Sequence, residues 1–192
     1  MSRKSRRRWR RLRESICLVV EGCTEESYFY FLQGRFPEIF RAKVTLKIHD
    51  AHGGSPLHIL EEARRENQKG HFDHVYLVYD FDRPEAPEAQ KKALKEGFEV
   101  YGARPCFERW LLAHFTTQNV REIAQKCRFF VEKVRLVVHG YRKGHCPALE
   151  RALQERLEEK LARARRQIKT FDQLLSALYI EVGKVLEEKD PK

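Results

Sequence analysis

The sequence predicts an α/β protein: a Rossmann-type parallel sheet of about four strands flanked by helices, with an α-helical C-terminal extension. Apolar runs rich in β-branched and aromatic residues, at residues 15–20 and 74–79, have almost no polar alternation. Such runs are typical of central strands covered on both faces. Strand and helix patterns alternate four times before residue 115. Alternation with short connections indicates parallel strands joined by right-handed crossovers.

The first elements each have a local signal. The apolar run at residues 15–20 stops at Glu21 and a glycine, after which Thr24 can cap a helix that runs to about residue 36. Residues 44–48 alternate between apolar and polar side chains, as expected of a strand with one exposed face. Ser55, followed by a proline, predicts the start of a helix that ends near residue 70.

The second half of the α/β pattern contains the apolar strand at residues 74–79, a polar helix over residues 87–96 and a strand over residues 98–101. A further helix opens over residues 104–112 with a proline in its first turn. From residue 119 the pattern changes to helix after helix, and leucines at every fourth position predict an apolar helix face over residues 149–161. We therefore predict three parts: a basic arm (1–14), an α/β domain (15–118) and a helical region (119–192).

The composition is that of a folded protein with a basic N-terminal arm. The chain is 42% hydrophobic and 11% aromatic, which excludes a disordered protein. The net charge is +10, and residues 1–13 supply seven arginines and one lysine without any acid, so the remainder carries about +2 (10 − 8). A basic arm suits an anionic partner such as nucleic acid, with Arg6, Arg7 and Arg8 as candidate phosphate contacts. A solvated terminus would have the same composition.

The cysteines and the hydropathy predict where the protein is found. The five cysteines are scattered, their number is odd, and no two form a Cys-x-x-Cys pair. This pattern argues against a disulfide framework and against a structural zinc ribbon, and it fits a reducing cytosol. No apolar stretch approaches the length of a membrane span. We therefore expect a cytoplasmic protein without a membrane partner.

Acidic residues follow two of the predicted strands. Asp80 and Asp82 end the strand at residues 74–79, and Glu21 follows the first strand. Ligands of parallel α/β sheets bind at the carboxyl ends of the strands, where these three carboxylates can converge. Side chains two apart on an extended backbone point the same way, and clustered carboxylates repel one another unless a cation such as Mg²⁺ or Mn²⁺ joins them. Alternatively, Asp80 and Asp82 are a polar strand exit that caps the next helix or pairs with Arg83.

These motifs occur in a recognisable order. Val-Glu-Gly-Cys-Thr-Glu at residues 20–25 is followed by Asp-Phe-Asp at residues 80–82, by Arg-Pro-Cys-Phe-Glu-Arg-Trp at residues 104–110 and by Tyr-Arg-Lys at residues 141–143. In this order and spacing, the chain resembles the Toprim fold and, more narrowly, the RloB-like family of prokaryotic defence-associated proteins. The resemblance covers roughly residues 16–145.

The resemblance implies a metal-dependent nuclease that cleaves RNA or DNA as the effector of an antiviral defence module. The resemblance implies that Glu21 is the general acid or base and that Asp80 and Asp82 hold Mg²⁺ or Mn²⁺. Glu25, on the first turn of the helix that follows Glu21, can add a ligand for a second metal ion. The metal neutralises the scissile phosphate and activates a water molecule, while a nearby carboxyl group transfers the proton.

The later motifs supply further candidates. Glu108 can reach the metal, or it can instead form a salt bridge to Arg104 or Arg109. Arg142 and Lys143 are candidate nucleic-acid contacts, although exposed basic side chains need no function.

A non-catalytic interpretation remains open. Families of this kind often act beside an ATPase partner, and this sequence has no Gly-x-x-x-x-Gly-Lys-Ser/Thr phosphate loop of its own. The protein is therefore either a nuclease or a module that binds nucleic acid or the ATPase partner through a degenerate Toprim site. The sequence contains no segment that resembles the strand-passage or primase parts of larger Toprim enzymes, which disfavours those two activities.

Overall fold

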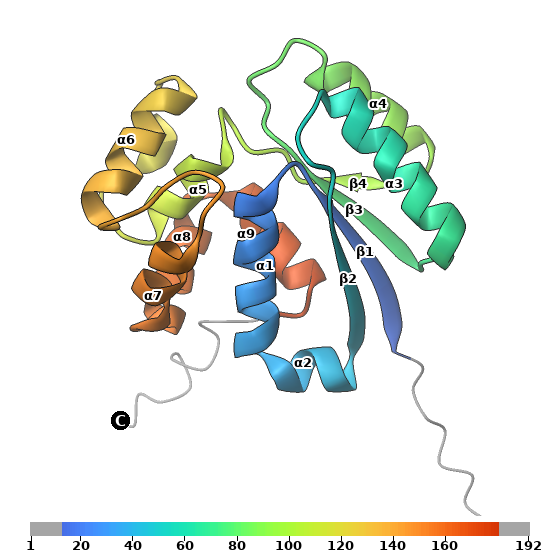
Figure 1. The fold of residues 1–192 in the computed structure, drawn as a ribbon, viewed down its shortest axis with the longest axis horizontal. Coiled ribbons are helices and arrows are strands. Elements are labelled where there is room, and N and C mark those ends of the chain that lie inside the picture. Colours follow the sequence, from blue (N-terminus) through green and yellow to red (C-terminus); the bar gives the residue numbers. More distant parts are fainter. Residues whose placement is uncertain (1–12, 181–192) are drawn as a thin grey trace, which may run out of the picture.

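The protein is built on one parallel sheet (Figure 1). A computed structural model describes residues 13–180. The strand order is β2-β1-β3-β4, and each neighbouring pair is parallel. The predicted α/β fold class, with helices following at the C-terminus, is therefore confirmed. The strands are β1 Glu14–Val20, β2 Val44–Asp50, β3 His74–Val78 and β4 Glu99–Val100.

Strand β1 is buried on both faces, as its continuous apolar run predicts. It pairs with β2 on one side and with β3 on the other. Because successive side chains of a strand point to opposite faces, Leu18 and Val20 belong to one buried cluster, and Cys17 and Val19 belong to another. The sheet is therefore the middle of three layers.

Helices cover both faces of the sheet (Figure 1). The smaller buried cluster, which contains Cys17 and Val19, is closed by α3 and α4. The larger cluster packs α1 and the C-terminal helices against the other face. The helices are α1 Cys23–Arg35, α2 Pro37–Ala42, α3 Pro56–Gly70, α4 Ala86–Lys95, α5 Phe107–Ala113, the 3₁₀ helix η1 Val120–Glu122, α6 Cys127–Val137, α7 Pro147–Gln154, α8 Leu157–Gln167 and α9 Lys169–Ala177.

The two predicted helix caps have different outcomes. Ser55 caps α3 as expected, because its hydroxyl oxygen accepts a hydrogen bond from the His58 N–H at 3.2 Å. The prediction for Thr24 is wrong: α1 begins at Cys23, and Gly22 is its N-cap. The Thr24 hydroxyl instead accepts a hydrogen bond from the Gly144 N–H at 2.9 Å. Thr24 therefore holds a distant loop rather than its own helix.

Two predicted helix boundaries also differ from the structure. The leucine pattern over residues 149–161 does not form one helix, because Arg156 adopts a left-handed conformation with φ of 50° between α7 and α8. The leucines at positions 149, 153, 157 and 161 are nevertheless all buried. Helix α5 begins at Phe107 with Cys106 as its N-cap, so Pro105 precedes this helix instead of lying in its first turn.

The C-terminal helices share a core with the α/β part. The Trp110 ring of α5 stacks on Phe171 of α9, with 5.0 Å between ring centroids. The buried Gln167 side chain accepts a hydrogen bond from the Val120 N–H at 3.0 Å and donates one to the Thr116 carbonyl at 3.0 Å. The domain boundaries stay a prediction, since the larger buried cluster includes residues from both sides of position 118. Within residues 13–180, no helix is both long enough and apolar enough to span a membrane.

Candidate active site

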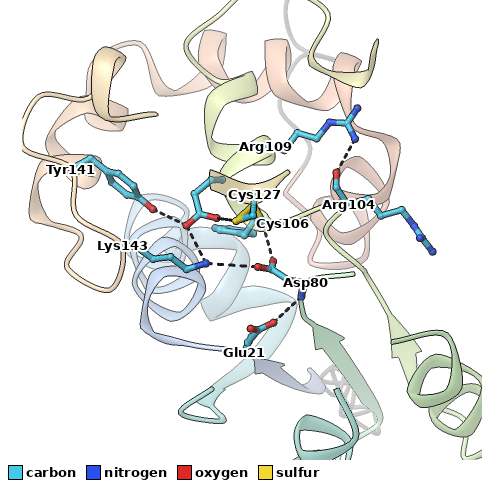
Figure 2. Close-up of a disulfide and its surroundings, with 10 residues drawn as sticks. Glu21, Asp80, Arg104, Cys106, Arg109, Cys127, Tyr141 and Lys143 are labelled. Atoms are coloured by element: carbon cyan, nitrogen blue, oxygen red, sulfur yellow. Dashed lines mark hydrogen bonds and ion pairs between the residues drawn. A yellow bond between two sulfur atoms is a disulfide. The ribbon is translucent and has the colours of Figure 1, made fainter. Parts of the chain in front are cut away.

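Glu21 and Asp80 meet at the carboxyl edge of the sheet (Figure 2). They follow the adjacent strands β1 and β3, and the Glu21 N–H continues the ladder by donating to the Val78 carbonyl at 3.0 Å. The Asp80 N–H donates a hydrogen bond to Glu21 Oε2 at 2.8 Å. Asp80 Oδ1 in turn accepts a hydrogen bond from the Phe107 N–H at 2.9 Å. The parallel sheet thus brings together two acids that are far apart in the sequence.

Asp82 lies differently from Asp80. Strand β3 ends at Val78, and the backbone turns at residues 81–82, so the extended conformation from which we predicted a common direction does not reach Asp82. Asp80 is buried and Asp82 is exposed. The negative charge of Asp82 still raises the pKa of Glu21, after the larger effect of burial. Asp82 therefore lies on the exposed rim of the site.

Glu25 and Glu108 are both buried acids beside Asp80. Glu108 Oε1 accepts a hydrogen bond from the Tyr141 hydroxyl at 3.3 Å and lies 3.3 Å from Lys143 Nζ. The alternative pairing of Glu108 with arginine is wrong. Arg109 donates instead to the Val120 carbonyl at 2.8 Å and to the Arg104 carbonyl at 2.8 Å, and the second of these bonds is drawn in Figure 2. We call Glu21, Glu25, Asp80 and Glu108 the carboxylate cluster.

A loop between α6 and α7 brings Lys143 to this cluster. Lys143 Nζ lies 3.7 Å from Asp80 Oδ2 as well as near Glu108. Gly144 adopts a φ of 81°, and a Cβ atom at this position would lie 3.3 Å from Cys23 Sγ. Glycine therefore suits both the turn and the close approach to α1, where Thr24 holds the loop. Among residues 13–180, Lys143 is the basic side chain that forms ion pairs with the cluster.

Burial and mutual repulsion raise the pKa values of Glu21, Glu25 and Asp80. Burial, and then the charge of Glu21, raise the pKa of Asp80 to about 8, against the opposing effect of Lys143. Burial raises the pKa of Glu25 well above its usual range, and the charges of Asp80 and Glu108 add to this effect. Burial also raises the pKa of Glu21. These three acids therefore hold protons more tightly than in water, as expected of buried acids with like charges nearby.

The pKa of Lys143 is also raised, but for a lysine this favours the charged form. Burial alone would lower its pKa, but the charges of Glu108, Asp80 and Glu25 outweigh burial and raise it. Its ammonium group therefore stays protonated and occupies a position where a cation stabilises two carboxylates at once. Part of the side chain, 47% of it, remains exposed.

A cavity of about 190 Å³ opens beside the cluster. It is lined by Glu21, Glu25 and Lys143, together with backbone of the Gly53 and Gly144 loops. A water molecule needs roughly 10–15 Å³ of such volume, so the cavity has room for several water molecules or for a hydrated cation. Two carboxylates of the cluster, Glu21 and Glu25, thus face a space that a ligand can enter.

The expectation about cysteines is wrong for one pair. Cys106 and Cys127 form a disulfide with 5.5 Å between their Cα atoms. Twenty-one positions separate them in sequence, and they meet because α5 and α6 pack together. The disulfide lies directly against the cluster, with Cys127 Sγ 3.6 Å from Glu108 Oε2 (Figure 2). The other three cysteines are free.

A basic groove begins next to the disulfide. Its volume is about 710 Å³, and its walls are the segment that precedes Cys106, the turn after Asp80 and residues 123–132. Arg104, Lys126 and Arg128 contribute positive charge, while Phe81 and Phe129 contribute aromatic surface. Arg128 pairs with Glu132 at 2.9 Å, and the Arg104 guanidinium lies over the Phe81 ring at 4.1 Å. The groove therefore carries both cationic and aromatic side chains.

The remaining predicted contacts lie elsewhere. Arg142 is exposed on the Lys143 loop. Arg6, Arg7 and Arg8 lie outside the described residues. Sequence reasoning missed Tyr141, Cys106 and Cys127 as neighbours of the carboxylates, although Tyr141 and Cys106 lie within the motifs already recognised. Their order in the sequence carries no signal that they touch Glu108, because those contacts depend on how α5, α6 and the Lys143 loop pack.

These observations define a class of protein: a four-stranded parallel α/β fold that gathers buried carboxylates at the carboxyl edge of its sheet. The family model of the RloB-like proteins matches residues 16–188. The chain therefore belongs to the RloB-like protein family. No curated protein and no solved structure matches it.

Proposed function

We propose that this RloB-like protein is a divalent-metal-dependent nuclease of the Toprim type. The observation that carries the proposal is the convergence of four carboxylates on one edge of the sheet, with a single lysine among them as counter-charge within the described residues. Carboxylate oxygens are the ligands that Mg²⁺ and Mn²⁺ prefer. Uncompensated acids in a cavity of this kind are a common feature of sites that perform chemistry.

The donor set of the cluster fits a hard divalent cation. Glu21 and Asp80 are held in place by backbone N–H groups, so the orientations of their carboxylates are set before any ligand binds. Glu25 lines the same cavity, and Asp82 on the rim can add a further oxygen. The ammonium group of Lys143 already occupies a cation position between two of the acids. Bound by Asp80 and Glu25, Mg²⁺ or Mn²⁺ would neutralise a scissile phosphate and lower the pKa of a water molecule.

The residues of the chain have separate roles in this proposal. Glu21 carries the proton, since burial raises its pKa towards the range in which a carboxyl group can both give and accept a proton. Asp80 and Glu25 hold the cation, and Asp82 supports it from the rim. Lys143 and the exposed Arg142 contact the phosphate that is being cleaved. Glu108 fixes Lys143 through the ion pair at 3.3 Å.

The basic groove supports nucleic acid as the substrate. Positive side chains attract the phosphate backbone, and aromatic rings stack on unpaired bases of any sequence. The groove starts beside Asp80 because Phe81 follows this residue in the chain and Arg104 lies two positions before Cys106. A strand lying in the groove would therefore reach the carboxylate cluster at one end.

The family membership suggests the biological setting. We propose that the protein is the effector of an antiviral defence module and that an ATPase partner controls it. The arginine-rich residues 1–13 can strengthen binding to RNA or DNA through phosphate contacts.

The proposal is tested by cleavage of mixed RNA and DNA by the purified protein in Mg²⁺ or Mn²⁺, with EDTA as the metal-free arm. We expect cleavage in the presence of the cation and none with EDTA. Glu21→Gln keeps the size and the hydrogen-bonding oxygen of Glu21 but removes the acid, so we expect the rate to fall by about 10² to 10⁴-fold.

The matched control for this change is Glu88→Gln. Glu88 is an exposed acid on α4 that pairs with Lys92 at 2.7 Å, on the face of the sheet away from α1. This variant should cleave at the wild-type rate. Equal rates for Glu21→Gln and the wild type would rule out the proposed role of Glu21.

The groove leads to a second prediction. Replacing Lys126 and Arg128 together with alanine should weaken binding of single-stranded RNA and DNA and reduce the slope of log affinity against log salt by roughly 2. Fluorescence anisotropy over a series of salt concentrations measures this slope. Lys92→Ala on α4 is the control for loss of positive charge at a distance. If the double variant keeps the wild-type slope, the groove does not carry the nucleic acid.

The groove also favours a second candidate function, which is a binding module without catalysis. In such a module, Asp80→Ala would leave RNA affinity intact, and the wild type would show no cleavage with any divalent cation. A nuclease would instead lose both metal binding and cleavage in this variant.

A further inference from the structure

The Cys106–Cys127 disulfide lies beside two buried carboxylates. Ligand atoms of Cys106, Cys127, Asp80 and Glu108 all lie within 4.8 Å of one another. Two sulfur atoms and two carboxylates therefore surround one point, on the side of Asp80 where α5 and α6 meet (Figure 2). None of the roles proposed above for the carboxylate cluster uses these sulfur atoms.

We propose that Cys106 and Cys127, once reduced, form with Asp80 and Glu108 a binding site for a thiophilic divalent cation such as Zn²⁺, and that oxidation to the disulfide abolishes this site. The proposal does not depend on nuclease activity, because its readouts are metal binding and thiol reactivity.

The donor set matches the ligand preference of Zn²⁺. This ion takes four ligands in tetrahedral arrangement from thiolates, histidines and carboxylates. With metal–sulfur bonds of about 2.3 Å, two thiolates on one tetrahedral ion lie about 3.8 Å apart, which falls within the observed 4.8 Å span of the four ligand atoms. Mg²⁺ prefers oxygen ligands, so thiolates select against it.

The disulfide and the metal site exclude each other. A sulfur atom bonded to the other sulfur is no longer a thiolate, and the thiolate is the form that binds metal. The backbone can support both states because α5 and α6 hold the two cysteines with their Cα atoms 5.5 Å apart.

The surroundings allow exchange between the two states. Cys106 is buried, whereas Cys127 is partly exposed and is flanked by Lys126 and Arg128 of the basic groove. We therefore expect an attacking thiolate to approach from the side of Cys127, where the neighbouring positive charges favour the anionic attacker. Lys143, which is partly exposed, can withdraw its ammonium group when a cation takes its place between Asp80 and Glu108.

The redox step balances with a thiol reagent. Two molecules of reduced glutathione, or one dithiol, supply two electrons and two protons; the Cys106–Cys127 bond breaks, and the reagent becomes a disulfide. Zn²⁺ then binds, and the two thiols release their protons. In the reverse direction, glutathione disulfide accepts two electrons from the thiolates, the protein disulfide forms, and Zn²⁺ is released.

The test uses the full chain, reduced with a dithiol, freed of reagent under anaerobic conditions and titrated with Co²⁺ and then with Zn²⁺. We expect one equivalent of Co²⁺ with a thiolate-to-cobalt charge-transfer band, which Zn²⁺ displaces and excess Mg²⁺ does not. Removal of even an outer-shell partner commonly costs 10 to 100-fold in metal affinity, so loss of a ligand in Cys127→Ser should cost at least roughly 100-fold. Cys23→Ser, which removes the exposed free cysteine, should retain the band.

A second measurement needs no variant. Zn²⁺ should protect Cys106 and Cys127 of the reduced wild type from alkylation, as read by mass spectrometry of the two peptides, and added glutathione disulfide should release the metal as both thiols disappear. A reduced wild type without the band, Zn²⁺ affinity in Cys127→Ser equal to that of the wild type, or alkylation of both cysteines unaffected by Zn²⁺ would each overturn the proposal.

Discussion

Replacing Asp80 with asparagine is expected to lower metal-dependent cleavage by roughly a thousandfold, through lost cation binding, while the metal-free fold becomes more stable at alkaline pH. Asparagine keeps the oxygen that accepts the hydrogen bond from the Phe107 N–H. It removes the negative charge on which binding of the proposed cation would depend. Activity and stability should therefore change in opposite directions.

The sign of the stability change follows from the pKa of Asp80. The folded protein raises this pKa to about 8, mainly through burial, whereas an unfolded chain has a value of about 3.9. Between these two values the folded state keeps a proton that the unfolded state has lost. The resulting stabilisation is fully present below the unfolded pKa and is lost as the pH rises through about 8. The asparagine side chain has no such proton to lose, so the Asp80→Asn variant does not lose stability in this way.

Urea unfolding in EDTA at several pH values, together with cleavage assays in Mg²⁺, measures both effects. The free energy of unfolding of Asp80→Asn relative to the wild type should increase with pH up to about 8. Added Mg²⁺ should stabilise the wild type and not the variant. If Asp80→Asn is less stable than the wild type at alkaline pH in EDTA, the charged form of Asp80 stabilises the fold through Lys143 and the Phe107 N–H, and the expected gain in stability is wrong.

Replacing Trp110 with alanine is expected to destabilise the protein by about 3–5 kcal/mol. The Trp110 side chain is 1% exposed, stacks on Phe171 of α9 and meets the His114 ring edge to face at 4.7 Å. Its loss would leave a cavity at the junction between the α/β layers and the C-terminal helices. The change should also loosen α5, which carries Glu108 and the N–H group that binds Asp80.

The matched control for this change is Trp110→Phe. The Trp110 Nε1 group is buried and has no hydrogen-bond partner among the described residues. Phenylalanine retains an aromatic ring and removes this unpaired donor. Trp110→Phe should therefore lower the free energy of unfolding much less than Trp110→Ala does. Urea denaturation of the three proteins gives both differences. If Trp110→Ala and Trp110→Phe lose the same free energy of unfolding, ring stacking does not contribute to the stability that Trp110 provides.

Much of the fold could be predicted because its signals are local. The apolar run before Glu21 has no polar face, so it must be covered on both sides, and the structure buries it there. The serine and proline at positions 55 and 56 start α3 because a hydroxyl and a fixed φ act within one turn. Parallel pairing then follows from alternation, and it brings Glu21 to Asp80 without any knowledge of side-chain packing.

The parts of the site that could not be predicted depend on distant contacts. Thr24 has the residue type of a helix cap, but a loop 120 positions away takes its hydroxyl group. Asp82 has the spacing of a metal ligand, but the backbone turns before it. Glu108 had two arginines nearby in sequence and pairs instead with Lys143, which the loop after α6 delivers.

The sequence by itself determined the order of strands and helices, the parallel sheet and the meeting of two acids at its edge, because hydrophobic periodicity and chain connectivity act along the chain. Only the tertiary structure decided that Glu25 and Glu108 are buried beside them, that Lys143 is their counter-charge, and that Cys106 and Cys127 lie against the same carboxylates. The reason is that burial, charge compensation and sulfur pairing are properties of surfaces brought together by packing, and no local pattern encodes which surfaces will meet.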